Sequence, residues 1–299
     1  DMSKATMKDV AALANVGVGT VSRVINNSGP VKETTRKKVN AAITELNYEP
    51  DEYARGLKMK HTNTIALIIP TTWHPFFGEF AYYVETELSK SNNKVLICNS
   101  NGDPQKEYEY VQMVKQNKVD GIIGITYTDI DQYISSDLPF VSVDRHFTED
   151  VSNITADNAS GGKKAAQELI NRGCQHLAYI GGYQETPNET KKRGEFFEKE
   201  VNRLGKKVSS LYMKEPIKDL KTQVRNFMKD HPTIDGVFCI NDFLALDCLD
   251  VFSELDLNVP EDIQVIGFDG VKMAKERSYL LSTISQPINQ MAEKAVDLL

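Results

Sequence analysis

Apolar and small residues recur at helical spacing near the start of the chain. Val10, Leu13 and Ala14 share the spacing of one helix face, and Asn15-Val16-Gly17 then interrupts the pattern. A second helical stretch follows at once. The pattern therefore predicts two short helices joined by a tight turn.

The second predicted helix, from about Val18 to Asn26, has two different faces. Val21 and Val24 point to one side. The other side carries hydrogen-bonding side chains, namely Thr20, Ser22, Arg23 and Asn26. A buried seam opposite short polar groups and an arginine is typical of a recognition helix in the DNA major groove. The alternative is an ordinary helical hairpin in a protein core.

Local signals mark where the helices of this region begin and end. Thr6 stands three residues before Asp9, which is typical of a capping box. A third helix is predicted at 32–46, and the proline of Asn47-Tyr48-Glu49-Pro50 ends it. The segment 51–60 has acids first and bases last, but ten residues do not hold a helix alone in water. It is interpreted as a linker that becomes helical when something holds it.

From residue 61 onward, short apolar runs alternate with helical stretches. Strands are predicted at 64–69, 94–99, 121–125, 140–143, 177–180, 208–212, 236–240, 263–268 and 281–284. Helices are predicted between them, at 76–91, 105–117, 159–172, 190–204, 220–229, 243–255 and 290–299, with a short one near Asp131. The alternation predicts parallel sheets covered by helices on both faces, and two runs in tandem predict two α/β lobes.

The net charge of −7 conceals an asymmetry. The first 60 residues contain ten Lys and Arg against seven acids, whereas the remainder contains 25 against 35. A basic head on an acidic body suits a head that contacts phosphates while the body repels them. The asymmetry favours nucleic-acid binding without establishing it.

The four cysteines are scattered and lie in apolar contexts: Cys98, Cys174, Cys239 and Cys248. They show neither a CxxC pair nor metal-ligand spacing, which predicts reduced core residues and no metal or other cofactor. No apolar run reaches the roughly 18 residues of a membrane span, and the first residues lack a signal-peptide pattern. We therefore expect a cytoplasmic protein without a membrane partner.

Several motifs occur in the order and at the spacing of one known family. They are TVSRVIN at 20–26, TRKKV at 35–39, LNYEP at 46–50 and ARGL at 54–57. On these motifs the sequence resembles the lactose-repressor family (LacI/GalR) of bacterial transcription regulators over essentially its whole length. Within that family it is most similar to the sucrose- and ribose-type repressors of sugar use.

The resemblance implies a fold and its boundaries. The fold is an all-α helix-turn-helix head with a hinge helix, followed by a two-lobed, periplasmic-binding-protein-like α/β body with two doubly wound parallel sheets. The head is expected at 1–49, the hinge at 50–61 and the body at 62–299. The first lobe takes 62–157 and 287–299, and the second takes 158–286. The chain is expected to cross between the lobes three times. The sequence ends inside its last predicted helix, so we expect a few further residues there.

The resemblance also implies DNA contacts in the head. Base-reading positions fall on Val18, Gly19 and Arg23, of which Arg23 can pair bidentately with a guanine edge. Val18 and Gly19 offer only apolar or backbone contacts. The implied phosphate-positioning residues are Thr6, Thr20, Ser22, Asn26, Lys32, Thr35 and Tyr48. The alternative for Arg23 is a solvated surface arginine.

In the hinge, the resemblance assigns Leu57 as a wedge inserted into the central base step of the minor groove. Arg55 and Lys58 are expected near phosphates. The alternative for Leu57 is a core or incidentally exposed leucine.

An aromatic loop after the first predicted strand resembles the family's effector loop. Trp73, Phe76 and Phe77 are expected to stack on the apolar face of a sugar, with His74 in place of the usual asparagine. The alternative is that Phe76 and Phe77 are core residues at a helix start.

Polar effector contacts are expected at the carboxyl ends of strands, where ligands of such sheets bind. The predicted residues are Asp144, Arg145, Arg193, Asn241, Asp269 and Gln286. Arg193 stands four residues before Phe197, although the lysines at 191 and 192 leave this alignment open by one residue. Asn241 is assigned the ligand contact, and Asp242 the helix N-cap.

The sequence as a whole predicts a homodimeric regulator that binds a palindromic operator and represses a sugar-use operon. A sugar between the lobes would control hinge-helix formation. The alternatives are a regulator corepressed by a purine or a phosphocarrier protein, and a sugar-transport binding protein. We expect no catalytic residues, because the sequence lacks a nucleophile elbow or P-loop, and His146 and His176 have no evident partner.

Overall fold

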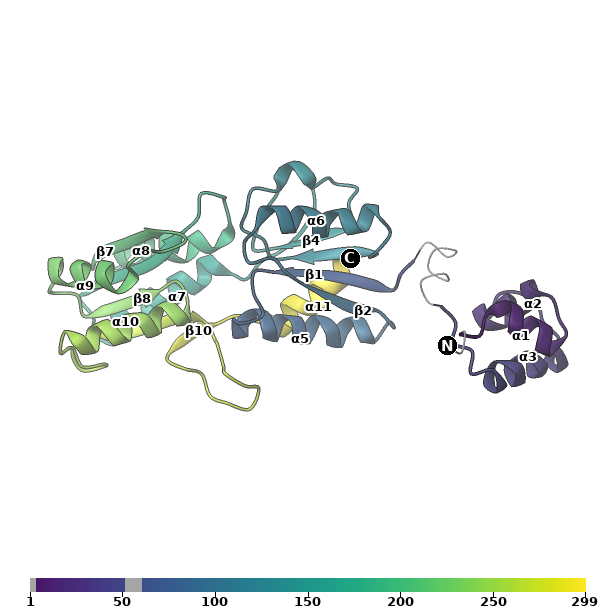
Figure 1. The fold of residues 1–299 in the computed structure, drawn as a ribbon. Helices are drawn as coiled ribbons and strands as arrows, with labels where there is room; N and C mark the ends of the chain where they lie inside the picture. Colours follow the sequence, from purple (N-terminus) through teal and green to yellow (C-terminus); the bar gives the residue numbers. More distant parts are fainter. Residues whose placement is uncertain (1–3, 52–60) are drawn as a thin grey trace. The chain divides into compact units, whose positions relative to one another are not determined.

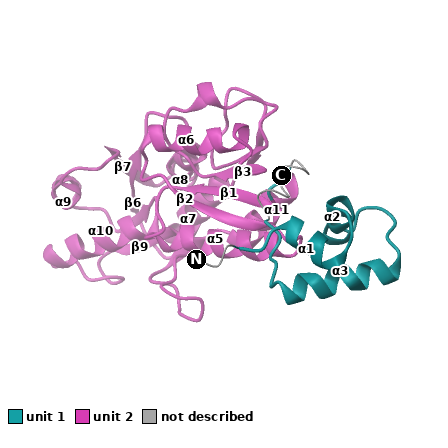
Figure 2. Ribbon diagram, turned by 45° about the vertical axis from the view of Figure 1, so that its right-hand side comes forward, with its two compact units in different colours: residues 1–62 teal, residues 63–299 magenta. Residues whose placement is uncertain are grey.

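The computed structural model describes residues 4–51 and 61–299. The chain divides into two compact units, residues 1–62 and residues 63–299 (Figure 2). The predicted hinge positions Arg55, Leu57 and Lys58 lie outside the described residues.

Within residues 4–51, the first unit is a bundle of three helices, α1 (Met7–Ala14), α2 (Val18–Asn26) and α3 (Glu33–Glu45). Its core is built on Val10, Val21 and Val39, all fully buried. Leu13 shares the helical spacing but is 46% exposed, and Ala11 completes the buried face of α1 instead. Small residues on this face let the helices approach closely.

The first lobe of the second unit contains a parallel sheet in the order β2-β1-β3-β4-β5. Its strands are β1 (Thr64–Ile69), β2 (Lys94–Asn99), β3 (Gly121–Gly124), β4 (Phe140–Val143) and β5 (Ser152–Ile154). The sequence pattern missed β5, because this three-residue edge strand buries only Ile154 and therefore carries almost no apolar signal.

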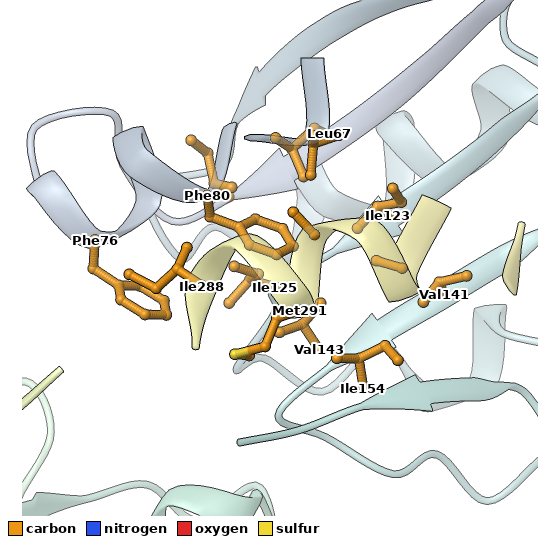
Figure 3. Packing of buried hydrophobic residues seen from close by; sticks show 14 of the residues in the cluster. Leu67, Phe76, Phe80, Ile123, Ile125, Val141, Val143, Ile154, Ile288 and Met291 are labelled. Atoms are coloured by element: carbon orange, nitrogen blue, oxygen red, sulfur yellow. The ribbon is translucent and has the colours of Figure 1, made fainter. Parts of the chain in front are cut away.

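Helices cover both faces of the first sheet (Figure 1). They are α5 (Pro75–Ser89), α6 (Pro104–Lys115), the 3-10 turn η1 (Asp131–Tyr133) and α11 (Ile288–Leu298). The chain's last helix, yellow in Figure 1, packs beside α5. Figure 3 shows Ile288 and Met291 of α11 packed with Phe80 and Ile123 in one core.

The second lobe repeats this plan with the strand order β10-β9-β8-β6-β7, again all parallel. Its strands are β6 (His176–Tyr183), β7 (Lys207–Lys214), β8 (Gly236–Cys239), β9 (Gln264–Asp269) and β10 (Thr283–Ser285). Its helices are α7 (Asn158–Asn171), η2 (Glu189–Lys191), α8 (Lys192–Arg203), α9 (Leu220–Asp230) and α10 (Asp242–Glu254). One apolar cluster packs under α9 and α10 and another under α7 and α8, so both faces are covered.

Three segments connect the lobes. Residues 155–157 lead from β5 to α7, and 286–287 lead from β10 back to α11. Between β9 and β10, the segment 270–282 places Val271 in the core of the first lobe. Its Lys275 ammonium lies over the Tyr82 ring of α5, 5.4 Å from the ring centroid. The body is therefore two sheets tied together beside their strand ends.

Candidate DNA-reading face and inter-lobe polar site

The start of α1 is fixed by a capping box, as predicted. The Thr6 amide donates to Asp9 Oδ2 at 2.7 Å, and the Asp9 amide donates to Thr6 Oγ1 at 3.3 Å. The hydrogen bonds from Thr6 hold the pKa of the Asp9 carboxyl below its usual value. The cap satisfies amides that the first turn leaves unpaired and thereby fixes where α1 begins.

Helix α2 separates its buried and exposed positions as a reading helix requires. Val21 and Val24 are buried against the other helices, whereas Arg23 is exposed and Val18 is 42% exposed. A Cβ added at Gly19 would meet nothing within 4 Å. All three predicted base-reading positions are therefore open to solvent.

The other predicted DNA contacts differ in their exposure. Asn26 Nδ2 donates to Ser22 Oγ at 3.2 Å, and Asn26 Oδ1 is buried without a hydrogen-bond partner in the described part of the chain. Lys32 is exposed just before α3, whereas Tyr48 is half-buried against the head core. Thr6, Thr20 and Thr35 are at least partly exposed. The phosphate-positioning roles of these residues stay predictions.

In the body, buried polar residues from both lobes gather at the carboxyl ends of strands. We refer to Asp144, Asn158, Arg193, Asp242, Asp269 and Gln286 as the inter-lobe cluster; all six are buried. Four of them were predicted as effector contacts, and the fold brings these four together from distant parts of the sequence.

Arg193 lies at the centre of the inter-lobe cluster, on the first turn of α8. Its Nε donates to Asn158 Oδ1 at 2.8 Å, and its Nη1 donates to the Ile240 carbonyl at 2.8 Å. The guanidinium stacks on the Phe268 ring, 3.7 Å from the centroid. Nη1 also lies 3.5 Å from Asp269 Oδ1. These partners compensate the burial of the charge and fix the direction of the side chain.

Asp144 and Asp269 enter the cluster from strand ends of different lobes. Asp144 follows β4 with φ 57°, and Asp269 ends β9 with φ 110°. Such values are uncommon for residues other than glycine and recur at functional sites. Thr155 Oγ1 donates to Asp144 Oδ1 at 2.9 Å, and Gln286 Nε2 donates to Asp269 Oδ1 at 2.6 Å. The Glu189 amide donates to the Asp144 carbonyl at 2.9 Å, so the backbone also joins the lobes.

Three carboxyl groups share one guanidinium in the cluster. Burial raises the pKa of Asp144, Asp242 and Asp269, in the case of Asp269 to about 7. The positive charge of Arg193 acts on each in the opposite direction but does not outweigh burial. Burial therefore favours the neutral form of these acids, and a proton on Asp269 is lost only near neutral pH.

The N-cap prediction for Asp242 is wrong, because Asn241 occupies that position. Asn241 has the extended backbone of an N-cap, and its Oδ1 accepts from the Leu244 amide at 2.8 Å. Asp242 points inward instead, and its Oδ2 accepts from the Val271 amide at 2.7 Å. A Cβ added at Gly267 would lie 2.2 Å from Asp242 Oδ1, so β9 passes directly beside this carboxyl. Asp242 thus holds the turn that follows Asp269.

The aromatic loop lies differently from the predicted stacking platform. Phe76 is buried in the first-lobe core, Phe77 packs partly against it, and Trp73 is 91% exposed. His74 caps α5, with Nδ1 accepting from the Phe76 amide at 3.1 Å. Its ring lies edge-on to Phe243 of the second lobe at 4.7 Å, and burial lowers its pKa to about 4. The core alternative is therefore favoured for Phe76, and sugar stacking by Trp73 stays a prediction.

Arg145 points away from the inter-lobe cluster. Its Nη1 donates to the Thr128 carbonyl at 2.5 Å and to Thr126 Oγ1 at 3.3 Å. Its guanidinium lies 4.2 Å from the centroid of the Phe147 ring, in the first lobe. These contacts favour a structural role inside the first lobe over the predicted effector contact.

Sequence reasoning missed two residues that belong to this site. Asn158 orients Arg193 from the start of α7, directly after a crossover. Tyr127 follows β3, and its hydroxyl is close enough to Asp144 and Arg193 for their charges to affect its pKa, which burial raises. The signal that could have indicated Tyr127 is its place just beyond the end of β3.

Two family models match the chain. The model described as bacterial regulatory proteins, lacI family, matches residues 6–51, and that of a periplasmic binding protein-like domain matches residues 166–299. The chain is 37% identical to the sucrose operon repressor of Pediococcus pentosaceus, over 99% of this chain and 91% of that protein. It is 36% identical to the ribose operon repressor of Bacillus subtilis (strain 168), over 99% of this chain and 90% of that protein. The chain belongs to the LacI family.

The lac repressor dimer bound to operator and the anti-inducer ONPF has the same fold as this LacI-family chain. The TM-score is 0.83 at 22% identity, over 99% of this chain and 91% of the other. The predicted architecture of a helix-turn-helix head and a two-lobed parallel α/β body is therefore confirmed. Membership of the LacI family confirms the predicted class, a DNA-binding regulator of transcription.

Other features of the LacI-family body lie outside the inter-lobe cluster. All four cysteines are buried and free, as predicted. His176, for which no partner was evident in the sequence, bonds Thr233 Oγ1 at 2.6 Å and Ser209 Oγ at 2.9 Å. His146 Nε2 lies 3.3 Å from Glu189 Oε1. Both histidines therefore have structural partners.

Within residues 4–51 and 61–299, no helix is long and apolar enough to cross a membrane, and no group of His, Cys, Asp and Glu could hold a metal ion. A groove of about 840 Å³ does lie along α7, β9 and β10. None of the predicted effector residues lines that groove.

Proposed function

We propose that this LacI-family chain is a homodimeric repressor of a sugar-use operon, and that a sugar held by the inter-lobe cluster controls its affinity for operator DNA. The observation that carries the proposal is the convergence of Asp144, Arg193, Asp269 and Gln286 from both lobes. A ligand that contacts residues of both lobes binds one lobe arrangement better than another and shifts their populations.

In the head, Arg23 reads a guanine in the major groove, while Val18 and Gly19 make apolar or backbone contacts with base edges. An exposed arginine on a helix whose opposite side is buried supports this role. The relatives whose names describe sucrose and ribose operon repressors support repression and a sugar effector.

The hinge at 50–61 transmits the response. Arg55, Leu57 and Lys58 contact the minor groove when paired hinges form helices, and the sugar-bound lobe arrangement separates the hinges. Operator DNA must then weaken sugar binding by the same factor by which sugar weakens operator binding.

A homodimer follows from the size of the reading surface. One nine-residue helix reads only a half-site, so a two-fold assembly on a palindrome is needed for specificity. The edge strand β2 exposes Leu96 and Ile97, each 42% exposed, and α5 beside it exposes Tyr82. An unpaired apolar strand edge of this kind is suited to contact with a second copy.

The test measures operator affinity by fluorescence anisotropy on a palindrome selected from a random DNA library. Saturating sucrose, fructose or ribose is then added in turn. We expect one of them to weaken binding at least about tenfold, within the usual range of allosteric coupling. A ligand that tightens binding would point to a corepressed regulator, and unchanged affinity with every sugar would refute control by sugar.

A further inference from the structure

The inter-lobe cluster contains many hydrogen-bond acceptors and few donors. The carboxylates of Asp144, Asp242 and Asp269 can only accept when ionised, and Arg193 is the one cationic member of the cluster. Arg193 already donates to Asn158 and to the Ile240 carbonyl. A ligand that adds further acceptors would therefore find few donors.

Two buried acceptors of the cluster lack a donor in the described part of the chain, Asp242 Oδ1 and Gln286 Oε1. Gln286 is 8% exposed, and its Nε2 is bound to Asp269 Oδ1 at 2.6 Å. Its Oε1 has no hydrogen-bond partner within the described part of the chain. Because buried acceptors are normally satisfied, Gln286 Oε1 indicates a place for a donor supplied by a ligand.

The charged groups of the inter-lobe cluster disfavour both anionic and cationic ligands. Three buried carboxyls repel an anion whenever they are ionised, and Glu189 adds a fourth acid close enough to act on the charge of Asp144. The Lys192 ammonium is paired with Glu189 Oε2 at 2.5 Å. Arg193, in the centre, repels an ammonium group. Phosphate recognition usually needs several arginines, lysines or free amides pointing at the ligand, and the cluster offers one arginine.

We propose that the inter-lobe cluster selects an uncharged, hydroxyl-rich ligand, an unphosphorylated sugar or polyol, and rejects its phosphorylated counterpart. Sugar hydroxyls donate to the Asp144, Asp269 and Gln286 oxygens and accept from Arg193. This inference rests on the proposed function only in placing the effector at the cluster. It concerns the charge class of the ligand, which membership of the family leaves open.

The test is a calorimetric titration of the full chain with matched pairs of ligands. The pairs are sucrose and sucrose 6-phosphate, fructose and fructose 6-phosphate, ribose and ribose 5-phosphate, and glucose and glucosamine. We expect an uncharged member to bind at least ~100-fold more tightly than its phosphate ester, because like charges brought together in a buried site cost several tenfold steps in affinity. Tighter or equal binding of an ester, a preference for glucosamine, or no binding by any uncharged sugar overturns the proposal.

Two variants separate the role of charge from the role of hydrogen bonding. Asp269→Asn removes one negative charge and should reduce the preference for sugar over ester at least ~5-fold, whereas the exposed Asp230→Asn should not. Gln286→Met removes the unpaired acceptor and should weaken sugar binding roughly tenfold. Gln264→Met, on the outer groove of the same lobe, is its control. Equal effects of a variant and its control would contradict the assigned contact.

Failure of this inference is distinguishable from failure of the proposed function. If an ester binds and also releases the operator, the chain is a ligand-controlled regulator and the charge assignment is wrong. If a sugar binds at the cluster but leaves operator affinity unchanged, the charge assignment stands and the regulatory proposal fails.

Discussion

Asp269→Asn should stabilise the body more strongly as pH rises. In the folded chain, burial raises the pKa of Asp269 from 3.8 to about 7. An acid whose pKa is higher in the folded chain than in the unfolded chain contributes stability at low pH. This contribution is lost as the pH rises through the pKa of the folded chain. The amide introduced by Asp269→Asn keeps an oxygen for Gln286 Nε2 but carries no charge, so the variant escapes the loss.

The magnitude follows from the size of the shift. Each pKa unit corresponds to about 1.4 kcal/mol, so ionised Asp269 destabilises the fold by up to about 4 kcal/mol at high pH. Part of this destabilisation is present already at pH 5, which lies above the usual pKa of an aspartate, 3.8. Between pH 5 and pH 8.5, the free energy of unfolding of the variant should therefore rise by roughly 2–3 kcal/mol relative to the parent.

Urea unfolding followed by circular dichroism at half-unit pH steps provides the measurement, because urea adds no ionic screening. The exposed Asp230→Asn change, at the end of α9, is the control for a change of net charge. If the difference between Asp269→Asn and the parent is the same at pH 5 and pH 8.5, Asp269 is ionised throughout and the argument from burial is refuted.

Four further outcomes are expected. Arg23→Ala should cost about 1–3 kcal/mol of operator binding and relax specificity at one base pair; a uniform loss across operator variants in anisotropy would make Arg23 a phosphate contact. Gly162→Ala should lower the free energy of unfolding by at least about 2 kcal/mol, because its Cβ would lie 2.2 Å from a backbone carbonyl of α8, whereas Gly19→Ala, with open space, should show no such loss. His74, whose pKa burial lowers to about 4, contributes stability above pH 6.5 that is lost as pH falls toward 4, and His74→Asn should flatten that slope in thermal melts. Leu96→Lys should convert dimers to monomers in sedimentation velocity, and an unchanged sedimentation coefficient would locate the interface elsewhere.

The fold was predictable where the apolar pattern is strong. Runs such as Thr64–Ile69 and Phe140–Val143 are buried on both faces of their sheet and were located within a residue. β5 escaped because its short edge strand buries one residue. The helical spacing of Leu13 wrongly predicts that it is buried. The small residues Ala11 and Ala14 fill the buried face of α1 instead, and Leu13 is exposed.

The sequence predicts where the residues of the inter-lobe cluster lie along the chain, but not the direction in which each side chain points. Asp144 and Asp269 lie at the strand ends where the sequence predicts them, and both are buried in the inter-lobe cluster. Arg145 follows Asp144 but is directed into the first lobe, because Asp144 leaves the extended conformation of β4 with φ 57° and the Arg145 guanidinium binds the Thr128 carbonyl. Asn241 and Asp242 are both good capping residues, and only the backbone angles decide which of them caps α10.

Helix α11 has a consequence for the order in which the body is made. Its residues Ile288, Met291 and Ala295 complete the core of the first lobe, although the whole second lobe separates them from β5 in the sequence. During synthesis every strand and helix of the second lobe emerges before that core is closed. The second lobe can therefore fold while the first still exposes the apolar surface under α5.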